Sequence, residues 1–427
     1  MMSCFIGALL LLAGATSAIA EEGQLPADQR AMMALDSGES DAVKALPESE
    51  QMVLKATLAL KEGSPDRALD YLKHDKSDSD PLLALLEAEA HRQSAVLAVA
   101  RAGTYARGLK ERKEDLENAD LSSGLGEAEV RLNAFIDQLD GIYGSPLHLL
   151  QLGADIKSVF LVDKARSRMF VYVRNSSGEF ERVADEYIVT GAKGGDKQKR
   201  GDARTPNGIY RFVKRLDDRE LEARYGPVAF PIDYPNELDK LHQKNGYGIW
   251  MHGYPVGVGR RPPQDTRGCF ALPNDRLLAM AEHVYLKQSW VIVGENFVFD
   301  QKERQGKLLD SVKGSLEQWK QDWSALDTEA YLNHYHTAFR SGKRNLAGWK
   351  RYKRLVNSNK SFIDVSISDL SLIHDPNNWS EGEMVVAEFN QHYRSNNYQD
   401  VTRKRVYLAR GGSDDAWKIL IEESITP

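Results

Sequence analysis

Cysteine is scarce in this sequence. Cys4 and Cys269 are the only two in 427 residues, which excludes a framework of several disulfides. Stability must therefore come from buried apolar cores, and a chain of this length with 42% hydrophobic residues can build about two or three of them. If a leader peptide carries Cys4 away, Cys269 remains as a lone thiol, which favours a nucleophile over a structural cross-link.

An excess of positive charge is also missing. The chain has 56 basic and 62 acidic residues, a formal net charge of -6, and no basic tail or stripe, so nucleic acid is not an expected partner. The glycine-rich stretch 191–208 lacks the G-K-[ST] pattern of a phosphate loop and does not open a helix. No His, Asp and Glu residues with metal-ligand spacing stand near Cys269, and the sequence predicts neither a metal nor a cofactor.

Long hydrophobic runs are absent except at the N-terminus. Residues 6–19 form an apolar run that is short for a transmembrane helix, and Ala18-Ile19-Ala20 matches a small-residue cleavage pattern. We therefore predict a secretory signal peptide at residues 1–20, although the first five residues carry no Lys or Arg. An uncleaved anchor is the alternative.

Residues 21–150 are predicted to be an α-helical domain. Helical spacing of apolar residues dominates, with hairpins expected at 51–74 and 81–113. The apolar and glycine pattern of residues 59–72 resembles a degenerate tetratricopeptide unit, and a plain helical bundle or dimerisation arm fits equally well. In either case the domain would offer an interaction surface, for an envelope protein partner or for a second copy of the chain.

Residues 156–296 are predicted to form a mainly β domain, because strand-like alternation replaces the helical period there. Its most informative stretch lies between Tyr247 and Asn274, where one histidine, one cysteine and three arginines stand among glycines and prolines. His252 follows the apolar residues of a buried strand. Cys269 follows a glycine in a tight loop that leads to a helix.

A cysteine and a histidine in this arrangement can carry out acyl transfer. A thiol with an ordinary pKa of about 8.5 is mostly protonated at neutral pH, and a neighbouring imidazole raises its thiolate fraction. We expect His252 to act as the base for Cys269, with the backbone amides of Gly268 and Cys269 directed at an oxyanion. A buried structural cysteine packed beside a histidine is the alternative.

Three separated motifs carry a resemblance to a known family. They are Gly201–Tyr210 (GDARTPNGIY), Trp250–Gly253 (WMHG) and Thr266–Asn274 (TRGCFALPN). In this order and spacing they resemble the catalytic domain of bacterial L,D-transpeptidases of the YkuD type. The resemblance implies a β-sandwich-like domain whose cysteine and histidine lie in a cleft under a flexible lid.

The resemblance assigns roles to individual residues. Cys269 would be the nucleophile, His252 its base and Gly268 a source of an oxyanion amide, with no metal or cofactor required. The sequence departs from the family at Arg267, where many members have histidine, and at Ala271, where many have arginine. Recognition of the substrate carboxylate is therefore left open. The candidates for substrate contact are Arg267, Thr266, Asn274, Arg260, Arg261, Tyr247 and Trp250.

The family's chemistry implies a peptidoglycan stem peptide as the substrate and the periplasm as the location. Cys269 would attack the L,D bond between diaminopimelate and D-alanine and form a thioester. An amine of a second stem as acceptor gives a cross-link, as in an L,D-transpeptidase. Water as acceptor gives an L,D-carboxypeptidase that trims tetrapeptides to tripeptides. A non-catalytic envelope scaffold that only binds stems is a third alternative.

Residues 308–425 are predicted to be an α+β domain that resembles the nuclear transport factor 2-like (NTF2-like) cone. Helices are expected at 308–326, 328–340 and 346–356, followed by antiparallel strands. Aromatic residues recur at helical spacing on these helices, as core or as the wall of a pocket: Trp319, Trp323, Tyr331 and Tyr335. The whole order of a helical, a mainly β and an α+β domain is similar to that of cell-shape-determining L,D-carboxypeptidases of helical bacteria.

Overall fold

The computed structural model describes residues 25–73, 81–101, 122–141, 144–258, 261–411 and 416–425. It divides into two compact units, residues 1–119 with 132–140 and residues 120–131 with 141–427, and each is treated by itself below. The predicted signal peptide lies outside the described residues. No helix within the described ranges is long and apolar enough to cross a membrane.

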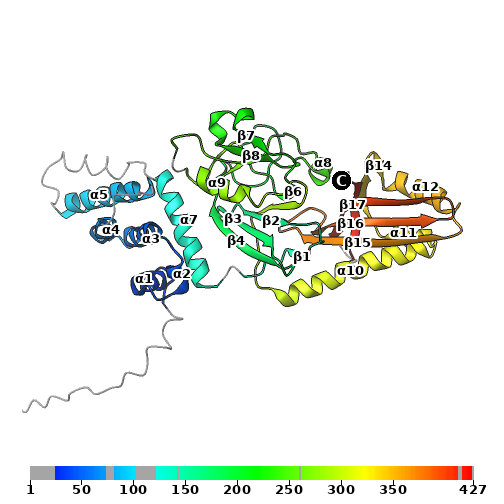
Figure 1. The fold of residues 1–427 in the computed structure, drawn as a ribbon, viewed down its shortest axis with the longest axis horizontal. Coiled ribbons are helices and arrows are strands. Elements are labelled where there is room, and N and C mark those ends of the chain that lie inside the picture. The colour runs from blue at the N-terminus through cyan, green and yellow to red at the C-terminus, as the bar shows by residue number, and fades with distance from the viewer. Residues whose placement is uncertain are drawn as a thin grey trace, which may run out of the picture. The chain divides into compact units, whose positions relative to one another are not determined.

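The first unit is helical, as predicted. Its helices are α1 (Ala27–Ser37), α2 (Asp41–Lys44), α3 (Glu48–Lys61), α4 (Pro65–Leu72), α5 (Pro81–Arg101) and the C-terminal half of α7 (Ser122–Leu139) (Figure 1). A core that includes Leu35, Leu58 and Phe135 holds α1, α3 and α7 together. The hairpin expected over 51–74 corresponds to α3 and α4, and the chain turns between them at Gly63, whose φ is 71°. The end of the expected hairpin at 81–113 lies outside the described residues.

The middle part of the second unit is a β-sandwich. One layer is a five-stranded sheet in the order β4-β3-β2-β12-β6, and the other is a four-stranded sheet in the order β11-β9-β8-β7. The strands of the first are β2 (Ser158–Asp163), β3 (Arg168–Arg174), β4 (Phe180–Tyr187), β6 (Gly208–Arg211) and β12 (Ser289–Gly294). The strands of the second are β7 (Leu216–Asp217), β8 (Val228–Pro231), β9 (Trp250–His252) and β11 (Phe270–Ala271). Two short strands, β5 (Thr190–Gly191) and β10 (Gln264–Thr266), pair with each other.

The space between the two layers is filled by apolar side chains from both. Phe160 and Val291 come from the five-stranded sheet, and Met251 and Phe270 come from the four-stranded one. Helix α9 (Asn274–Ala281) adds Leu277 to the same core. Because Met251 and Phe270 point into this core, their neighbours along β9 and β11 must point to the opposite face. The sandwich thereby presents His252 on the outside of the four-stranded layer.

The C-terminal part of the second unit is an α+β domain. Its seven-stranded sheet runs in the order β1-β15-β16-β17-β18-β13-β14. The strands are β13 (Tyr335–Ser341), β14 (Arg344–Asn345), β15 (Ile363–His374), β16 (Glu383–Ser395), β17 (Gln399–Arg410) and β18 (Lys418–Ser424). The edge strand β1 (Leu149–Gln151) precedes the sandwich in sequence but pairs antiparallel with β15, a placement that the sequence did not reveal.

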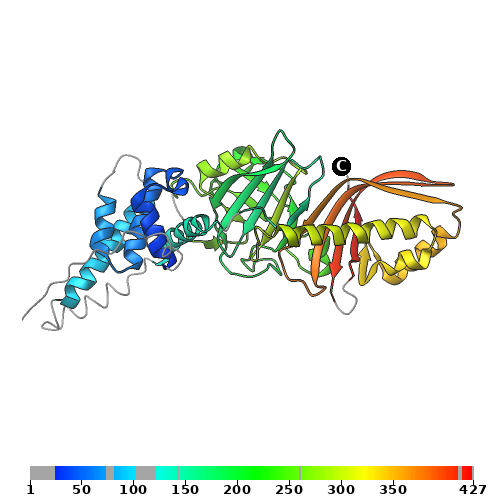
Figure 2. The ribbon, with the colours of Figure 1, turned by 90° about the horizontal axis from the view of Figure 1, so that it is seen from below.

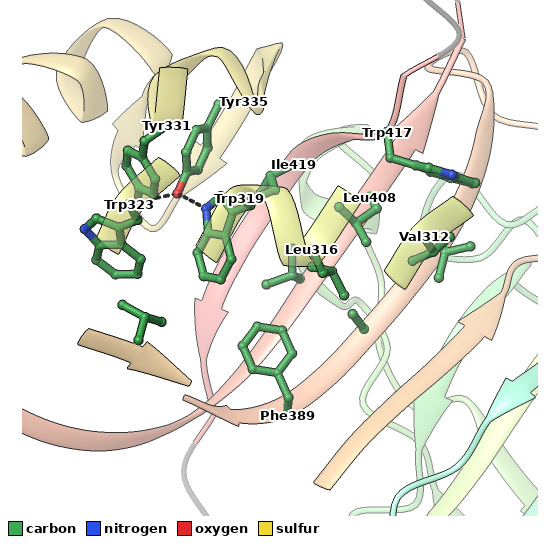
Figure 3. Close-up of a cluster of buried hydrophobic side chains, with 14 of the residues drawn as sticks. Val312, Leu316, Trp319, Trp323, Tyr331, Tyr335, Phe389, Leu408, Trp417 and Ile419 are labelled. Atoms are coloured by element: carbon green, nitrogen blue, oxygen red, sulfur yellow. Dashed lines mark hydrogen bonds between the residues drawn. The ribbon is translucent and has the colours of Figure 1, made fainter. Parts of the chain in front are cut away.

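Helix α10 (Lys302–Ser324) runs along one face of this sheet (Figure 2). Its buried residues Leu308, Val312, Leu316, Trp319 and Trp323 recur every three or four positions and therefore form one stripe. Figure 3 shows this stripe facing Phe389 and Leu408 of the sheet, with the Tyr335 hydroxyl between Tyr331 and the indole of Trp319. The aromatic residues that the sequence singled out thus lie in the core of the domain.

The fold class predicted from the sequence is confirmed, with two corrections in the C-terminal domain. The helix expected over 308–326 is α10, which begins six residues earlier at Lys302 and ends at Ser324. The helix expected over 328–340 is α11 (Thr328–Asn333), and Tyr335 begins the strand β13. Spacing of four residues between Tyr331 and Tyr335 looked helical, yet both rings reach the same core from a helix end and a strand start. The third helix, α12 (Leu346–Asn357), begins where the sequence predicted.

A relay of buried imidazoles joins the segment before β1 to the C-terminal sheet. The backbone N–H of Val298 donates to His148 Nε2 (3.1 Å), so the proton of neutral His148 is on Nδ1. That Nδ1–H donates to His374 Nδ1 (2.9 Å), and His374 Nε2–H donates to Glu383 (3.0 Å). Burial is the main cause that lowers the pKa of His148 to about 3. The relay therefore needs His148 in its neutral form.

Candidate active site

The pairing of β9 with β11 sets the positions of the cysteine and the histidine. The two strands are parallel, with Phe270 opposite Met251 and Ala271 opposite His252. Cys269 precedes β11 directly and is therefore level with Trp250, diagonal to His252 and on the same face of the sheet. The sequence predicted a loop leading into a helix at this point and missed this short strand, which is what aligns the two side chains.

His252 is buried and held by its own chain. Its Nδ1–H donates to the carbonyl of Gly253 (2.7 Å), which leaves Nε2 unprotonated in the neutral ring. The edge of the imidazole meets Tyr225, with ring centroids 5.1 Å apart. Burial, reinforced by the positive charges of Arg261 and Arg224, lowers the pKa of His252 to about 4. At neutral pH the ring is a hydrogen-bond acceptor at Nε2 and can take a proton.

Cys269 is a half-buried thiol. Its S–H donates to the carbonyl of Gly248 (Sγ···O 3.5 Å). Burial raises the pKa of Cys269 to about 11, against the opposing effects of the backbone N–H of Trp250 and the charge of Lys197. The resting pair is therefore thiol and neutral imidazole, and the thiolate forms only when the proton leaves for a base.

Two threonine hydroxyls hold the backbone of the cysteine in place. Thr266 Oγ1 donates to the carbonyl of Cys269 (2.7 Å) and accepts from the N–H of Gly268 (3.0 Å). Thr205 Oγ1 donates to the same carbonyl (3.3 Å) and accepts from the N–H of Gly191 (2.9 Å). Each hydroxyl thus donates its single hydrogen to the carbonyl oxygen of Cys269. The two hydrogen bonds together fix the peptide plane between Cys269 and the next residue.

Gly268 allows two backbone segments to approach closely, a role that the sequence did not predict. Its N–H is bound to Thr266, so in this state the Gly268 amide is not directed at a substrate oxyanion. Its φ is +123°, and a Cβ there would lie 2.6 Å from the carbonyl oxygen of Arg204. Glycine is therefore required for the close approach of two backbone segments.

The arginines predicted to contact the substrate differ in their exposure to solvent and in their ion pairs. Arg267 is exposed. Arg261 is mostly buried and donates to the carboxylate and the carbonyl of Asp265 (2.8 Å each), so its charge is already paired. Arg260 lies outside the described residues. Asn274 starts α9 and accepts from the backbone N–H of Tyr254 (2.8 Å), which makes it a support of the loop after His252.

An aromatic wall stands beside the histidine. The rings of Trp250 and Tyr225 lie 4.9 Å apart, and Tyr225 also contacts His252. Tyr247 is 68% exposed, with the guanidinium of Arg200 5.0 Å from its ring centroid. Partly exposed aromatic rings of this kind suit a substrate chain that lies across them.

Four residues at the site escaped the sequence reasoning as functional candidates: Tyr225, Arg224, Lys197 and Thr205. Lys197 is buried and paired with Asp202 (2.7 Å), and its charge favours the thiolate of Cys269. Thr205 was visible within the motif GDARTPNGIY, but nothing in the sequence indicated its bond to the cysteine. Among the described residues, no three His, Cys, Asp or Glu side chains are grouped as a metal site.

Comparison with known families matches two parts of the chain. Residues 157–293 match the YkuD family, the L,D-transpeptidase catalytic domain, and residues 311–423 match the Cds6 C-terminal NTF2-like domain. A curated protein of Escherichia coli strain K12, "Putative L,D-transpeptidase YafK", is 30% identical over 113 residues, or 26% of this chain. The match spans 40% of that protein's length.

Solved structures match a larger part of the chain. The helical cell shape determining protein Pgp2 from Campylobacter jejuni is 30% identical, with a TM-score of 0.56 over 66% of this chain and 97% of that one. Bd1075 from Bdellovibrio bacteriovorus is 28% identical, with a TM-score of 0.56 over 66% of this chain and 98% of that one. This chain belongs to the L,D-transpeptidase (YkuD) family and carries an NTF2-like domain after its catalytic domain.

Proposed function

We propose that this protein catalyses cysteine-dependent acyl transfer on peptidoglycan stem peptides, cleaving the L,D bond between diaminopimelate and D-alanine. The observation that carries the proposal is the register of β9 and β11, which puts a thiol and a neutral imidazole on one face of the sheet. The family match supports the substrate class.

The proposed reaction uses the protonation states of the resting site. His252 Nε2 accepts the proton of Cys269 as the sulfur attacks the carbonyl carbon of the third stem residue. The tetrahedral oxyanion is stabilised by the N–H of Cys269, because the Gly268 amide is held by Thr266. The C–N bond then breaks, the imidazolium gives its proton to the amine of D-alanine, and a thioester remains on Cys269.

The acceptor determines the product. With an amine of a second stem as the acceptor, the enzyme is an L,D-transpeptidase and forms a cross-link. Water is the second candidate, and it would make the enzyme an L,D-carboxypeptidase that trims tetrapeptides to tripeptides. The likeness of 66% of this chain to a helical cell shape determining protein favours this second candidate and a role in cell shape.

We further propose that the chain is exported to the periplasm behind the signal peptide at residues 1–20. The family's cell-wall substrate supports this location. We also propose that the helical unit binds an envelope protein or a second copy of the chain.

Mass spectrometry of muropeptides incubated with the full chain tests the proposal. Loss of one D-alanine from tetrapeptides identifies a carboxypeptidase, whereas dimers linked through two third residues identify a transpeptidase. Both products should vanish with Cys269→Ala. If the native chain produces neither and still binds sacculi, the scaffold alternative replaces the enzymatic one.

A further inference from the structure

A cavity among the described residues lies away from Cys269, where the catalytic domain meets the NTF2-like domain. Its volume is about 670 Å³. Strand β6 and residues 233–240 and 286–288 form one wall, and strands β15, β16, β17 and β18 form the other. This size is within the range of small-molecule sites in proteins.

Buried ion pairs organise this cavity. Glu388 accepts from Arg211 (2.6 Å) and from Arg405 (2.7 Å), and Arg403 lies 3.6 Å from it. The guanidinium of Arg211 also stacks on Trp290, 3.4 Å from the ring centroid. Arg211 is only 5% exposed, so its charge depends on the groups around it.

Carboxylates outnumber cations around the inner part of the cavity. Glu237 and Lys240 pair with each other at the rim (2.6 Å). The remaining acidic lining residues are Asp155, Asp233, Asp369, Glu388 and Glu423, against Arg211, Arg403, Arg405 and the exposed Lys287. Burial and the neighbouring carboxylates raise the pKa of Glu423 to about 7 and raise that of Asp155. The cavity is therefore short of positive charge.

The lining also leaves both a donor and an acceptor unused. Among the described residues, buried Arg211 Nη1 and Glu423 Oε1 have no hydrogen-bond partner. The cation nearest to Glu423 is Arg405 Nη1 at 3.6 Å, beyond hydrogen-bond distance. Buried polar groups are almost always satisfied, so an unused donor and an unused acceptor at one cavity indicate a ligand that supplies both.

We propose that this cavity binds the zwitterionic head of an α-amino acid. Its ammonium group would lie against Glu423 and Asp155, and its carboxylate would lie against Arg211, since each of these three side chains has a buried polar atom without a partner. A ligand with an ammonium group alone would leave the Arg211 donor unused. An anion alone would meet an excess of carboxylates.

Two sources can supply this chemistry. One is a free amino acid such as the D-alanine that the proposed reaction releases, and the other is the free end of diaminopimelate on a stem peptide, which carries an amine and a carboxylate on one carbon. Binding of a zwitterion does not depend on the proposed function, whereas the choice of these two sources rests on it.

Isothermal titration calorimetry on the full chain tests the site. Cys269 is first alkylated with iodoacetamide, so that turnover cannot contribute heat. The probes are D-alanine and a stem tripeptide ending in diaminopimelate, with D-alanine amide as the ammonium-only probe and N-acetyl-D-alanine as the carboxylate-only probe. We expect at least one of the two zwitterions to bind and both single-charge probes to bind at least about ten-fold more weakly. Tripeptide binding without D-alanine binding assigns the site to stem ends, and the reverse assigns it to the free amino acid.

Matched variants separate this cavity from other binding surfaces. Glu423→Gln should weaken zwitterion binding about ten-fold or more, whereas Glu329→Gln, in an exposed ion pair with Arg354 outside the cavity lining, should leave it unchanged. Thermal melting of both variants checks that they fold. Binding near pH 7 should also release a proton from Glu423, seen as a heat that depends on the buffer.

The proposal is overturned if neither zwitterion binds the native chain, if the single-charge probes bind equally well, or if both variants lose binding alike. None of these outcomes affects the muropeptide assay, so a failure here is distinguishable from a failure of the proposed reaction.

Discussion

The Cys269–His252 site and the domain junction both hold ionisable side chains away from solvent, but these side chains differ in charge. At the Cys269–His252 site, burial keeps both side chains neutral, and their hydrogen-bond partners are backbone carbonyls. At the junction, Arg211, Arg405 and Glu388 stay charged because they pair with one another. A neutral thiol and imidazole can exchange a proton, whereas a paired charge resists a change of protonation. Burial therefore suits proton transfer at the first place and cohesion between domains at the second.

The largest effect should come from removing the proposed base, His252. His252→Gln should lower kcat by about 10²- to 10⁴-fold, because the thiol then has no acceptor for its proton. His283→Gln, a histidine with no described contact to His252 or Cys269, is the matched control and should leave kcat unchanged. Turnover of muropeptides followed by mass spectrometry gives both rates.

The pH profile of the native enzyme tests whether Cys269 and His252 are neutral in the resting state. With the pKa of His252 lowered to about 4 and that of Cys269 raised to about 11, kcat/KM should stay flat between about pH 5 and pH 10. It should fall at lower pH as the imidazole gains a proton. A steep limb near pH 7 would mean that the resting pair is ionised, and the contrast drawn above would fail.

The next largest effect should be on the folding of the junction. Glu388→Gln leaves two buried guanidinium groups without their shared carboxylate, and we expect a loss of about 3–5 kcal/mol in the free energy of unfolding. Glu329→Gln breaks the exposed ion pair with Arg354 and should cause no measurable change. Urea denaturation of the two variants compares them directly. Equal stability of the variants would show that the junction does not depend on paired charge.

The imidazole relay predicts a loss of stability in acid. The pKa of His148 is about 3 in the folded chain and about 6.5 when unfolded, so the unfolded state binds the extra proton first. The stability contributed by neutral His148 is complete above about pH 6.5 and is lost as the pH falls towards 3. Melting temperatures between pH 7 and pH 4 should therefore fall more steeply for the native chain than for His148→Gln.

The smallest effect should come from the threonine hydroxyls that hold the backbone of Cys269. Thr205→Val removes one of the two hydroxyl bonds to the carbonyl of Cys269 and should lower kcat about ten-fold, with KM little changed. Thr205→Ser keeps the hydroxyl and should restore the rate. The rate of alkylation by iodoacetamide measures the thiol alone. A loss of stability with normal kcat would show that Thr205 only supports the fold.

Much of the fold was predictable, because periodicity changes clearly along the chain. Helical spacing before the sandwich, alternation within it, and the amphipathic stripe of α10 each correspond to an element that the structure contains. Strand β1 was not predictable, since three residues carry little signal and their partner β15 lies far along the chain. Tyr335 was misread for a related reason, because spacing of four residues fits a helix as well as a helix end followed by a strand.

The candidate site was predictable in its residue types but not in its bonds. Cys269 and His252 were singled out by their glycine-rich surroundings and by the motifs around them. The carbonyl that orients His252 belongs to Gly253, and no sequence pattern marks a backbone acceptor. Thr205 reaches Cys269 across 64 positions, a contact that exists only once the sheets have formed. Only a structure can identify residues that act through such long-range hydrogen bonds.

The place of β12 in its sheet has a consequence for biosynthesis. It is the last strand of the catalytic domain in sequence, yet it lies between β2 and β6, pairing with the first in parallel and with the second antiparallel. During synthesis, β2 and β6 emerge first and cannot complete their layer until residues 289–294 follow. A nascent or prematurely terminated chain that already contains Cys269 therefore still lacks one strand of the layer that packs against the four-stranded sheet. The surroundings of Cys269 are complete only when the whole domain has been made.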